Sequence, residues 1–283
     1  MLTSQLLEIP LRHGSDYLHC YDATGYSAPD HRPMVRDAWS LTLHQPPRDL
    51  RVLSKAHQVQ FFRKLPEAMQ RIVLPDETDF SRPLAGSYPL HGRISPARRY
   101  FNPRLFSIDA GQGTGHWLAL YRSPSGTVIP SAGALIGTVM YDAEDDQPPQ
   151  DQSWKPAAWA LVTAVVTPTV GDPLRFIAQA DAHGDFILPL NRMPALAKDA
   201  PSSTYAAVLT VQMAAIDEET DNEEENTNLD EDNVINPDQL VDADIESFTE
   251  ADDFLPAIEL AVTPGNAMRI TSQDKNFIVL RQR

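Results

Sequence analysis

Asp181 and Asp185 are the side chains whose type and spacing come closest to an acid–base pair. Two carboxylates facing each other across a cleft can hydrolyse a glycosidic bond, one as the acid and the other as base or nucleophile. Here both belong to the run Asp-Ala-His-Gly-Asp, in which Gly184 is placed to take a positive φ, and this is typical of a hairpin turn. We therefore expect turn-forming carboxylates, and a carboxylate-based hydrolase is the least favoured alternative.

Tryptophan and histidine are the other candidates for chemistry. If Trp117, Trp154 and Trp159 lay exposed in a row, they would form a face for sugar rings, whereas tryptophans packed into the core are the commoner arrangement. The eight histidines are scattered, and their spacing matches no metal-binding pattern. The sequence contains no G-x-S-x-G, H-E-x-x-H or C-x-x-C motif and no glycine-rich phosphate or dinucleotide loop. We expect no catalytic residue, no cofactor and no metal, and so no enzyme.

The acidic residues concentrate in one segment, 217–253. It holds 17 Asp and Glu and no Lys or Arg, which leaves 22 acidic residues against 23 basic ones in the rest of the chain. A composition rich in acids and poor in aromatics is typical of a solvated surface loop. Calcium binding is the alternative, but the segment lacks the glycine that an EF-hand loop needs. We expect a solvated or partner-facing loop between two strands.

The composition is that of a folded protein made in a reducing compartment. Hydrophobic residues make up 42% of the chain, and its 24 dispersed prolines favour short strands over long helices. The single Cys20 excludes an intramolecular disulfide and is expected to be a buried apolar side chain. The first ten residues lack a signal-peptide pattern, and no window is apolar enough to span a membrane. We expect synthesis and folding in the cytoplasm.

Residues 1–128 are expected to form an N-terminal β-rich domain. The run Trp39-Ser-Leu-Thr-Leu alternates apolar and polar residues, as a strand does when one face is buried. A short helix over Leu65–Val73 is the one helical alternative, with Pro66 at its first position. The expected strands, each bounded by turn-forming residues, are Leu6–Leu11, Tyr17–Tyr21, Trp39–Leu43, Leu50–Leu53, Val59–Phe62, Arg71–Leu74 and Trp117–Tyr121.

Residues 129–283 are expected to form a second domain, a β-sandwich with the acidic insertion 217–253. Seven short strands over about 150 residues fit such a sandwich. They are Leu135–Tyr141, Ala157–Val166, Phe176–Ala180, Asp185–Leu190, Tyr205–Met213, Ile258–Val262 and Asn276–Leu280. The fold class predicted for the whole chain is therefore all-β, with two tandem β-sandwich domains.

Residues 80–104 form a basic and aromatic stretch with poor periodicity, and we expect an irregular connection there. Arginine beside aromatic residues is typical of protein interfaces, whereas RNA binding would need a stacking platform that the sequence does not reveal. Residues 48–104 carry 11 bases and 5 acids, so the acidic segment of a neighbouring copy could dock there in a homo-oligomer. The candidate interaction residues are Arg93, Arg98, Arg99, Tyr100, Phe101 and Arg104, together with Glu223, Glu224, Glu225, Asp230, Glu231 and Asp232.

Part of the second domain contains short sequence motifs that are similar to those of a known family. Gly137-Thr-Val139 opens it, Ala160-Leu-Val162 follows, and Asp181-Ala-His-Gly-Asp-Phe186 supplies a D-x-x-G-x-F turn. This pattern, over residues 134–190, resembles the carboxypeptidase-regulatory-like, or transthyretin-like, β-sandwich. The resemblance implies a module that assists folding, adhesion or assembly and does not catalyse a reaction.

A wider layout joins the β-rich N-terminal unit to three segments, Pro156–Leu161, Ala180–Leu190 and Thr263–Leu280. This layout resembles accessory structural proteins of extracellular contractile injection systems, the phage-tail-like particles of bacteria. The resemblance implies assembly in the cytoplasm, release within an extracellular particle, and sheath, tube, baseplate or cap proteins as partners. We expect a non-enzymatic structural or adaptor subunit that binds no nucleic acid. A carbohydrate- or cell-surface-binding module is the alternative.

Overall fold

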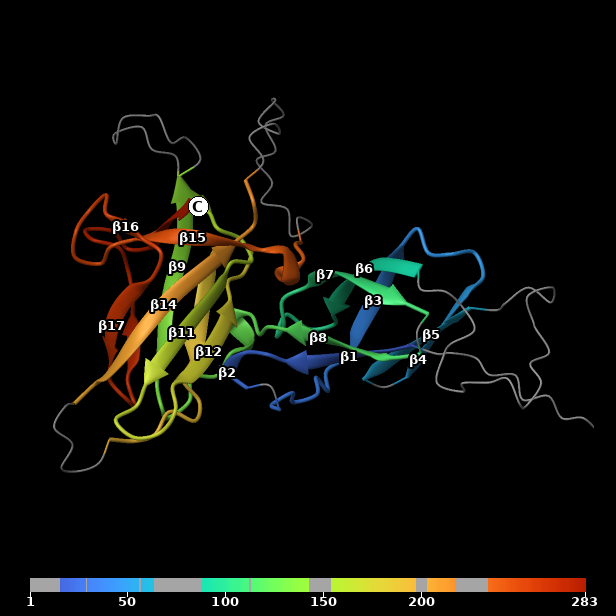
Figure 1. Ribbon diagram of the computed structural model, residues 1–283, viewed down its shortest axis with the longest axis horizontal. Coiled ribbons are helices and arrows are strands. Elements are labelled where there is room, and N and C mark those ends of the chain that lie inside the picture. Colours follow the sequence, from blue (N-terminus) through green and yellow to red (C-terminus); the bar gives the residue numbers. More distant parts are fainter. Residues whose placement is uncertain are drawn as a thin grey trace, which may run out of the picture.

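The computed structural model describes residues 16–28, 30–55, 57–63, 88–111, 113–142, 154–196, 203–216 and 234–283. Over these residues the protein is all-β, as predicted, and its helices are two single 3₁₀ turns, η3 (Pro124–Gly126) and η4 (Pro237–Gln239). Figure 1 shows two lobes side by side. We call β1 and β3 to β8 the N-terminal lobe, and β2 and β9 to β19 the C-terminal lobe.

Three elements expected from the sequence lie outside the described residues. They are the strands Leu6–Leu11 and Arg71–Leu74 and the alternative helix Leu65–Val73. The division into two domains near residue 128 stays a prediction.

The N-terminal lobe packs two sheets face to face. One sheet has the order β4 (Leu50–Lys55), β5 (Gln58–Arg63), β1 (Asp16–Asp22) and β8 (Gly115–Leu120), and the other has β3 (Trp39–His44), β6 (Tyr88–Pro96) and β7 (Arg104–Ala110). Leu18, Cys20, Phe61, Ile94 and Phe106 point between the sheets and are almost fully buried. Burying a large apolar side chain contributes about 1.5–3 kcal/mol. This core therefore fixes β1 and β8, whose other faces carry the site described below.

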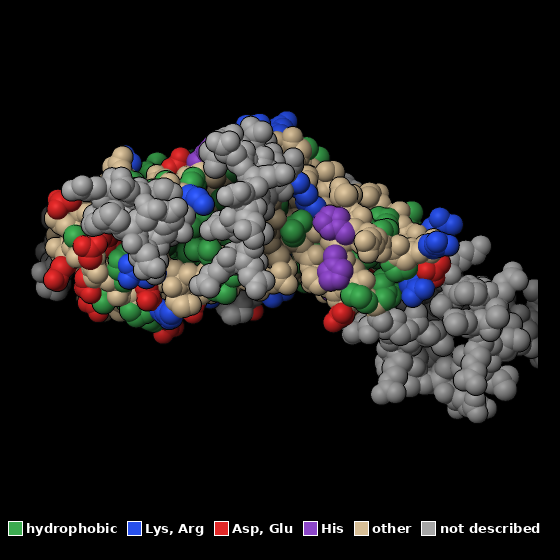
Figure 2. Space-filling view, turned by 90° about the horizontal axis from the view of Figure 1, so that it is seen from above, with side chains coloured by type: hydrophobic (Ala, Val, Ile, Leu, Met, Phe, Trp, Pro, Cys, Tyr) green, Lys and Arg blue, Asp and Glu red, His purple; other side chains and the backbone are tan. Residues whose placement is uncertain are grey.

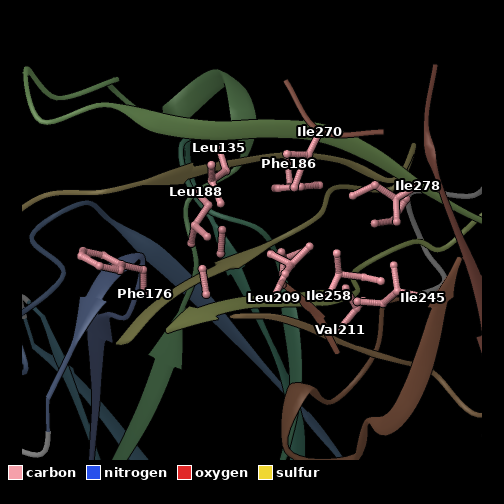
Figure 3. Packing of buried hydrophobic residues seen from close by; sticks show 14 of the residues in the cluster. Leu135, Phe176, Phe186, Leu188, Leu209, Val211, Ile245, Ile258, Ile270 and Ile278 are labelled. Atoms are coloured by element: carbon pink, nitrogen blue, oxygen red, sulfur yellow. The ribbon is translucent and has the colours of Figure 1, made fainter. Parts of the chain in front are cut away.

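The C-terminal lobe is a twelve-stranded sheet that folds back on itself. Figure 3 shows Leu135 and Phe186 on one side of its core, facing Leu209 and Ile258 on the other. Its strands are β2 (Gly25–Ser27), β9 (Ala134–Asp142), β10 (Trp154–Pro156), β11 (Leu161–Thr167), β12 (Leu174–Gln179), β13 (Asp185–Pro189), β14 (Tyr205–Met213), β15 (Val241–Glu246), β16 (Phe254–Leu255), β17 (Ile258–Val262), β18 (Ala267–Arg269) and β19 (Ile278–Gln282).

β9 is the strand around which the C-terminal lobe is organised. It pairs antiparallel with β10 and β13 and parallel with β18 and β19. The predicted tight turn leads into β13, but it does not form a hairpin, because β13 pairs with β9 whereas β12 pairs with β11 and β2. Gly184 in this turn has a φ of +81°, and its carbonyl accepts a hydrogen bond from the N–H of Val139 in β9. A Cβ atom on Gly184 would lie 2.3 Å from the Val139 carbonyl oxygen, so only glycine fits this position.

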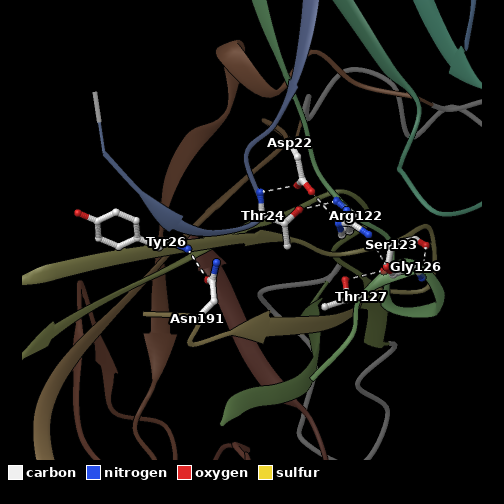
Figure 4. Close-up of polar contacts among 8 residues, drawn as sticks. All are labelled: Asp22, Thr24, Tyr26, Arg122, Ser123, Gly126, Thr127 and Asn191. Carbon is white, nitrogen blue, oxygen red and sulfur yellow. Dashed lines mark hydrogen bonds and ion pairs between the residues drawn. The ribbon is translucent and has the colours of Figure 1, made fainter. Parts of the chain in front are cut away.

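β2 joins the two lobes by backbone pairing. It follows β1 after a short turn, yet it pairs with β12 of the C-terminal lobe. Figure 4 shows the contacts that fix it: the Asp22 carboxylate accepts from the N–H of Thr24 and from Arg122, and the N–H of Tyr26 donates to Oδ1 of Asn191 at 2.8 Å. A small apolar cluster fills the junction, with Ala119, Tyr121, Leu161 and Ile177 as its buried members. The N-terminal part of the chain therefore contributes a strand to the sheet of the C-terminal lobe, and the two lobes also make a packed contact.

The prediction of an irregular connection over residues 80–104 is wrong for its central part. Residues Tyr88–Pro96 form β6, which lies between β3 and β7 and so is the central strand of its sheet. Tyr88, Leu90, Gly92 and Ile94 lie on the core face, while Pro89, His91 and Arg93 face outward, because a strand places alternate residues on opposite faces.

The prediction of a loop over the whole acidic segment 217–253 is also wrong for its last part. Val241–Glu246 forms β15, which pairs with β14 and β19. Ala243 and Ile245 are buried, and the Glu246 carboxylate is buried against Nζ of Lys275 at 2.6 Å. Residues 217–233 lie outside the described residues. On the face drawn in Figure 2, most acidic side chains lie over the C-terminal lobe and the largest histidine patches over the N-terminal lobe.

Candidate interaction surface at the junction of the lobes

Stacked side chains lie on the outer face of β1 and β8. Tyr17 and His19 alternate along β1 with core residues, and His19 is beside Trp117 in the parallel register with β8. The ring centroids of His19 and Trp117 are 4.8 Å apart, and those of Tyr17 and His19 are 6.5 Å apart. Trp117 remains 42% exposed and Tyr17 38% exposed. Large aromatic side chains are therefore held in order on a surface that solvent reaches.

Arg32 extends this surface toward the C-terminal lobe. Its guanidinium carbon lies 5.8 Å from the ring centre of Trp117 and 5.8 Å from that of Tyr21. The segment that carries it runs along β1, where the N–H of Asp22 donates to the carbonyl of Pro33 at 2.8 Å. A cation over an exposed aromatic ring gains about 0.5–1 kcal/mol, so ring contacts hold Arg32 in place. We call Tyr17, His19, Trp117, Arg32 and Tyr21 the aromatic row.

A pocket of about 310 Å³ opens where the aromatic row meets the C-terminal lobe. Arg192, from the turn after β13, stands beside it: its guanidinium carbon is 5.1 Å from the ring centre of Tyr26, and its Nη2 is 3.4 Å from Nδ1 of His31. We call this hollow the arginine pocket. Its polar lining comes from Tyr21, Tyr26, Ser27, His31, Arg32 and Arg175.

Three guanidinium groups, those of Arg32, Arg175 and Arg192, gather at the arginine pocket. Among the residues that the structure describes, no Asp or Glu lines the pocket. Within the described part of the chain, neither Arg32, Arg175 nor Arg192 forms a salt bridge. Asp22, at the end of β1, is already paired with Arg122 at 2.7 Å. Because like charges repel, this arrangement favours an anion in the pocket.

The flat faces of the rings on this surface are partly covered by other side chains. The His19 ring stacks on Trp117 and the Arg32 guanidinium lies over the same ring. Tyr26 likewise has the Arg192 guanidinium over it. These rings therefore present their edges to solvent more than open faces. Tyr, Trp and Arg in such surroundings are the side chains that most often dominate the energy of protein interfaces.

The predicted interaction residues from the stretch 80–104 are not all available for contact. Arg98, Arg99 and Tyr100 are exposed, and Arg93 is half-buried on β6. Phe101 and Arg104 are only 4% and 1% exposed, so their prediction as surface contacts is wrong.

Arg104 is instead a buried link between the lobes. Its Nη1 donates to the carbonyl of Ala119, and its Nη2 donates to Asn236 and to Asp238. The other predicted interaction residues, Glu223, Glu224, Glu225, Asp230, Glu231 and Asp232, lie outside the described residues. Docking of a neighbouring copy's acidic segment on residues 48–104 stays a prediction.

The three tryptophans considered for sugar binding do not share one exposed row. Trp117 is exposed, Trp154 is half-buried against Phe277 and Lys275, and Trp159 is 5% exposed. Trp159 also has a φ of +63°, in the turn that precedes β11. Only Trp117 of the three belongs to the surface described above.

The carboxylates of Asp181 and Asp185 are turn formers, as predicted. Oδ1 of Asp181 accepts from the N–H groups of His183 and Asp185 at 2.8 and 3.1 Å. Asp185 accepts from the hydroxyl of Thr138 at 2.5 Å. Partial burial raises the pKa of Asp181 above its usual value, and the two backbone hydrogen bonds oppose this only in part. Both side chains therefore have their hydrogen-bond partners in or beside the turn between β12 and β13.

The aromatic row and the arginine pocket were not among the sites predicted from sequence. Alternation in Tyr17-Leu-His-Cys-Tyr21, with a polar aromatic ring at every second position, is the local signal for the row. The arginines carry no such signal, because Arg32, Arg175 and Arg192 are far apart in sequence and are united only by the pairing of β2 with β12.

No group of three or more His, Cys, Asp or Glu among the described residues is placed to hold a metal ion. In that same part of the chain, no helix has the length and apolarity needed to cross a membrane. Comparisons with protein-family models, with curated proteins and with solved structures give no match.

Proposed function

We propose that this chain is a non-enzymatic structural or adaptor subunit that binds a partner protein through the aromatic row. The observation that carries the proposal is the stacking of His19 on Trp117, with Arg32 over the same ring, on an exposed sheet face. A preordered aromatic surface loses little conformational entropy on binding. Buried under a partner, such residues supply most of the affinity of an interface.

The identity of the assembly is a further part of the proposal. The segments that resemble accessory proteins of contractile injection particles are Pro156–Leu161, Ala180–Leu190 and Thr263–Leu280. All three contain residues that pair with β9 or donate hydrogen bonds to it. The resemblance therefore concerns one contiguous part of the fold. We propose a phage-tail-like contractile particle, assembled in the cytoplasm and released from the cell, with sheath, tube, baseplate or cap proteins as partners.

A carbohydrate- or cell-surface-binding module is the second candidate, and the exposure of Trp117 favours it. Sugar rings stack on a free aromatic face, which the cover of His19 and Arg32 on Trp117 reduces. For this reason a protein partner is the better match to the aromatic row.

The test is to tag the full chain in the organism that makes it, crosslink gently and identify the co-purifying proteins. The same experiment is run with Trp117→Ala and with Leu255→Ala, a control at a large apolar side chain that is 37% exposed on β16 of the C-terminal lobe. We expect one set of proteins with the wild type and the control, and its loss with Trp117→Ala. Binding of a purified partner to the purified chain should weaken about tenfold or more in Trp117→Ala.

Each other outcome rejects a defined part of the proposal. Recovery of the chain alone, or recovery that Trp117→Ala leaves unchanged, overturns the adaptor surface. Partners other than particle proteins reject the particle and retain the adaptor. Binding to a glycan array without any protein partner replaces the proposal with the carbohydrate-binding module. Thermal unfolding of both variants checks that they are folded.

A further inference from the structure

The arginine pocket gathers positive charge with few of its guanidinium groups engaged: within the described residues, their one side-chain hydrogen bond is that of Arg192 to His31. Arg32 and Arg192 are ordered by contact with the rings of Trp117, Tyr21 and Tyr26 rather than by carboxylates. Arg175 is exposed on β12, and within the described residues its side chain has no hydrogen-bond partner. A guanidinium fork that is ordered but unpaired can bind a carboxylate through two parallel hydrogen bonds.

The pocket is also continuous with the aromatic row, because Arg32 and Tyr21 belong to both. A ligand that lies across the row therefore reaches the pocket without leaving the surface. One anionic side chain fits a volume of about 310 Å³, and apolar side chains next to it in sequence would pack on the ring edges of the row.

We propose that the arginine pocket binds an acidic peptide segment of the partner protein, with an Asp or Glu side chain in the pocket and its apolar neighbours on the aromatic row. This inference rests on the proposed function, since it names the chemistry of the partner that the row binds. Charge complementarity carries it: three arginines lie in or beside the pocket, and no carboxylate of the described residues lines it.

A peptide fits these observations better than an acidic polysaccharide. An acidic sugar polymer would use the same arginines, but it would also need open ring faces for its sugar rings. Here Trp117 and Tyr26 have guanidinium groups over their rings. Peptide side chains, in contrast, pack against ring edges and accept or donate hydrogen bonds there.

The test measures binding of a fluorescein-labelled peptide, Gly-Ser-Glu-Leu-Asp-Glu-Leu-Ser-Gly, to the full chain by fluorescence anisotropy. A matched peptide with Gln and Asn in place of the acids is the ligand control. We expect saturable binding of the acidic peptide with a Kd below about 1 mM. Arg175→Gln and Arg192→Gln should each weaken binding about tenfold, because each removes a charge-assisted hydrogen-bond donor. The affinity of Arg175→Lys should lie between those of the wild type and Arg175→Gln, since lysine keeps the charge but cannot form two parallel hydrogen bonds.

The protein control is Arg51→Gln, the same change at an exposed arginine of β4, and it should bind as the wild type does. Any of three results overturns the inference. They are the lack of saturable binding up to about 1 mM, equal binding of the neutral peptide, and binding that Arg175→Gln leaves unchanged. Arg175-dependent binding of polygalacturonate without binding of the peptide overturns it in favour of an acidic glycan. Partner recovery that needs Trp117 and not Arg175 rejects the inference and leaves the proposed function intact.

Discussion

Nη2 of Arg104 and Oδ2 of Asp238 are 2.5 Å apart, and this pair joins the two lobes of the protein. Arg104 begins β7 in the N-terminal lobe, and Asp238 lies on η4 in the C-terminal lobe. The guanidinium is buried, while Asp238 is largely exposed. The arginine also donates to the carbonyls of Ala119 and Leu105, so most of its hydrogen-bonding capacity is used inside the protein.

Replacing Arg104 should destabilise the protein strongly. Arg104→Met is expected to lower the free energy of unfolding by about 3 kcal/mol, because it leaves the Ala119 carbonyl without its donor. Arg98→Met, at an exposed arginine that lies over Tyr100, should change it by less than about 0.5 kcal/mol. Urea denaturation of the two variants measures the difference. Equal stabilities would show that Arg104 is dispensable for the junction.

Gly184 and Gly171 allow backbone strain to be separated from steric clash. Both have positive φ, +81° and +105°, but an added Cβ meets the Val139 carbonyl oxygen at Gly184 and nothing within 4 Å at Gly171. Gly171→Ala should therefore cost about 1 kcal/mol from backbone conformation alone. Gly184→Ala should cost clearly more, since the turn must also move away from β9. Thermal unfolding of the pair tests this, and an equal cost would contradict the clash.

The raised pKa of Asp181 predicts a defined pH dependence. Burial raises this pKa above the ordinary value of 3.8, so the folded state binds a proton more tightly than the unfolded state. The contribution of Asp181 to stability is then fully present below pH 3.8 and is lost as pH rises through the folded pKa. Asp181→Asn should remove this part of the pH dependence. Unfolding free energies from pH 3 upward measure it, and parallel curves for both proteins would rule it out.

Cys20 should be unreactive in the folded protein. Burial raises the pKa of its thiol to about 12, and the side chain is fully excluded from solvent on β1. Because the thiolate is the reactive form, a thiol reagent at pH 8 should label the denatured chain quickly and the folded chain only through unfolding. Mass spectrometry after timed labelling checks this. Rapid labelling under native conditions would mean that β1 opens locally.

Strands with a clean alternation of buried and exposed residues were predictable from sequence. β3 and β14 are examples. The turn at Gly184 was also predictable, from its turn-forming residues. β6 was missed because Pro89, Gly92 and Pro96 interrupt its apolar pattern. Two of them have a structural reason: a Cβ on Gly92 would lie 2.6 Å from the Thr42 carbonyl oxygen, and Pro89 lies beyond the end of the pairing with β3.

β15 and the candidate site were missed for different reasons. Val-Asp-Ala-Asp-Ile-Glu alternates as a strand should, but its acids made it look like the rest of the segment 217–253. The buried Glu246 is paired with Lys275, which is 29 positions away in sequence. The site depends on β2, a strand of three residues that pairs with a strand about 150 residues later. Long-range pairing of so short a strand leaves no periodic signal in the sequence.

The placement of β2 also decides how the chain can be divided. A fragment that begins at residue 129 would lack β2, and β12 would become an open edge of the C-terminal sheet. Unpaired edges recruit strands from other molecules, so this fragment should self-associate. A second fragment, to which residues 25–27 are joined by circular permutation, keeps β2 on β12 and should stay monomeric. Light scattering of the two fragments distinguishes them. The three residues of β2 therefore act as a built-in cap against aggregation, and the cap is donated by the other half of the molecule.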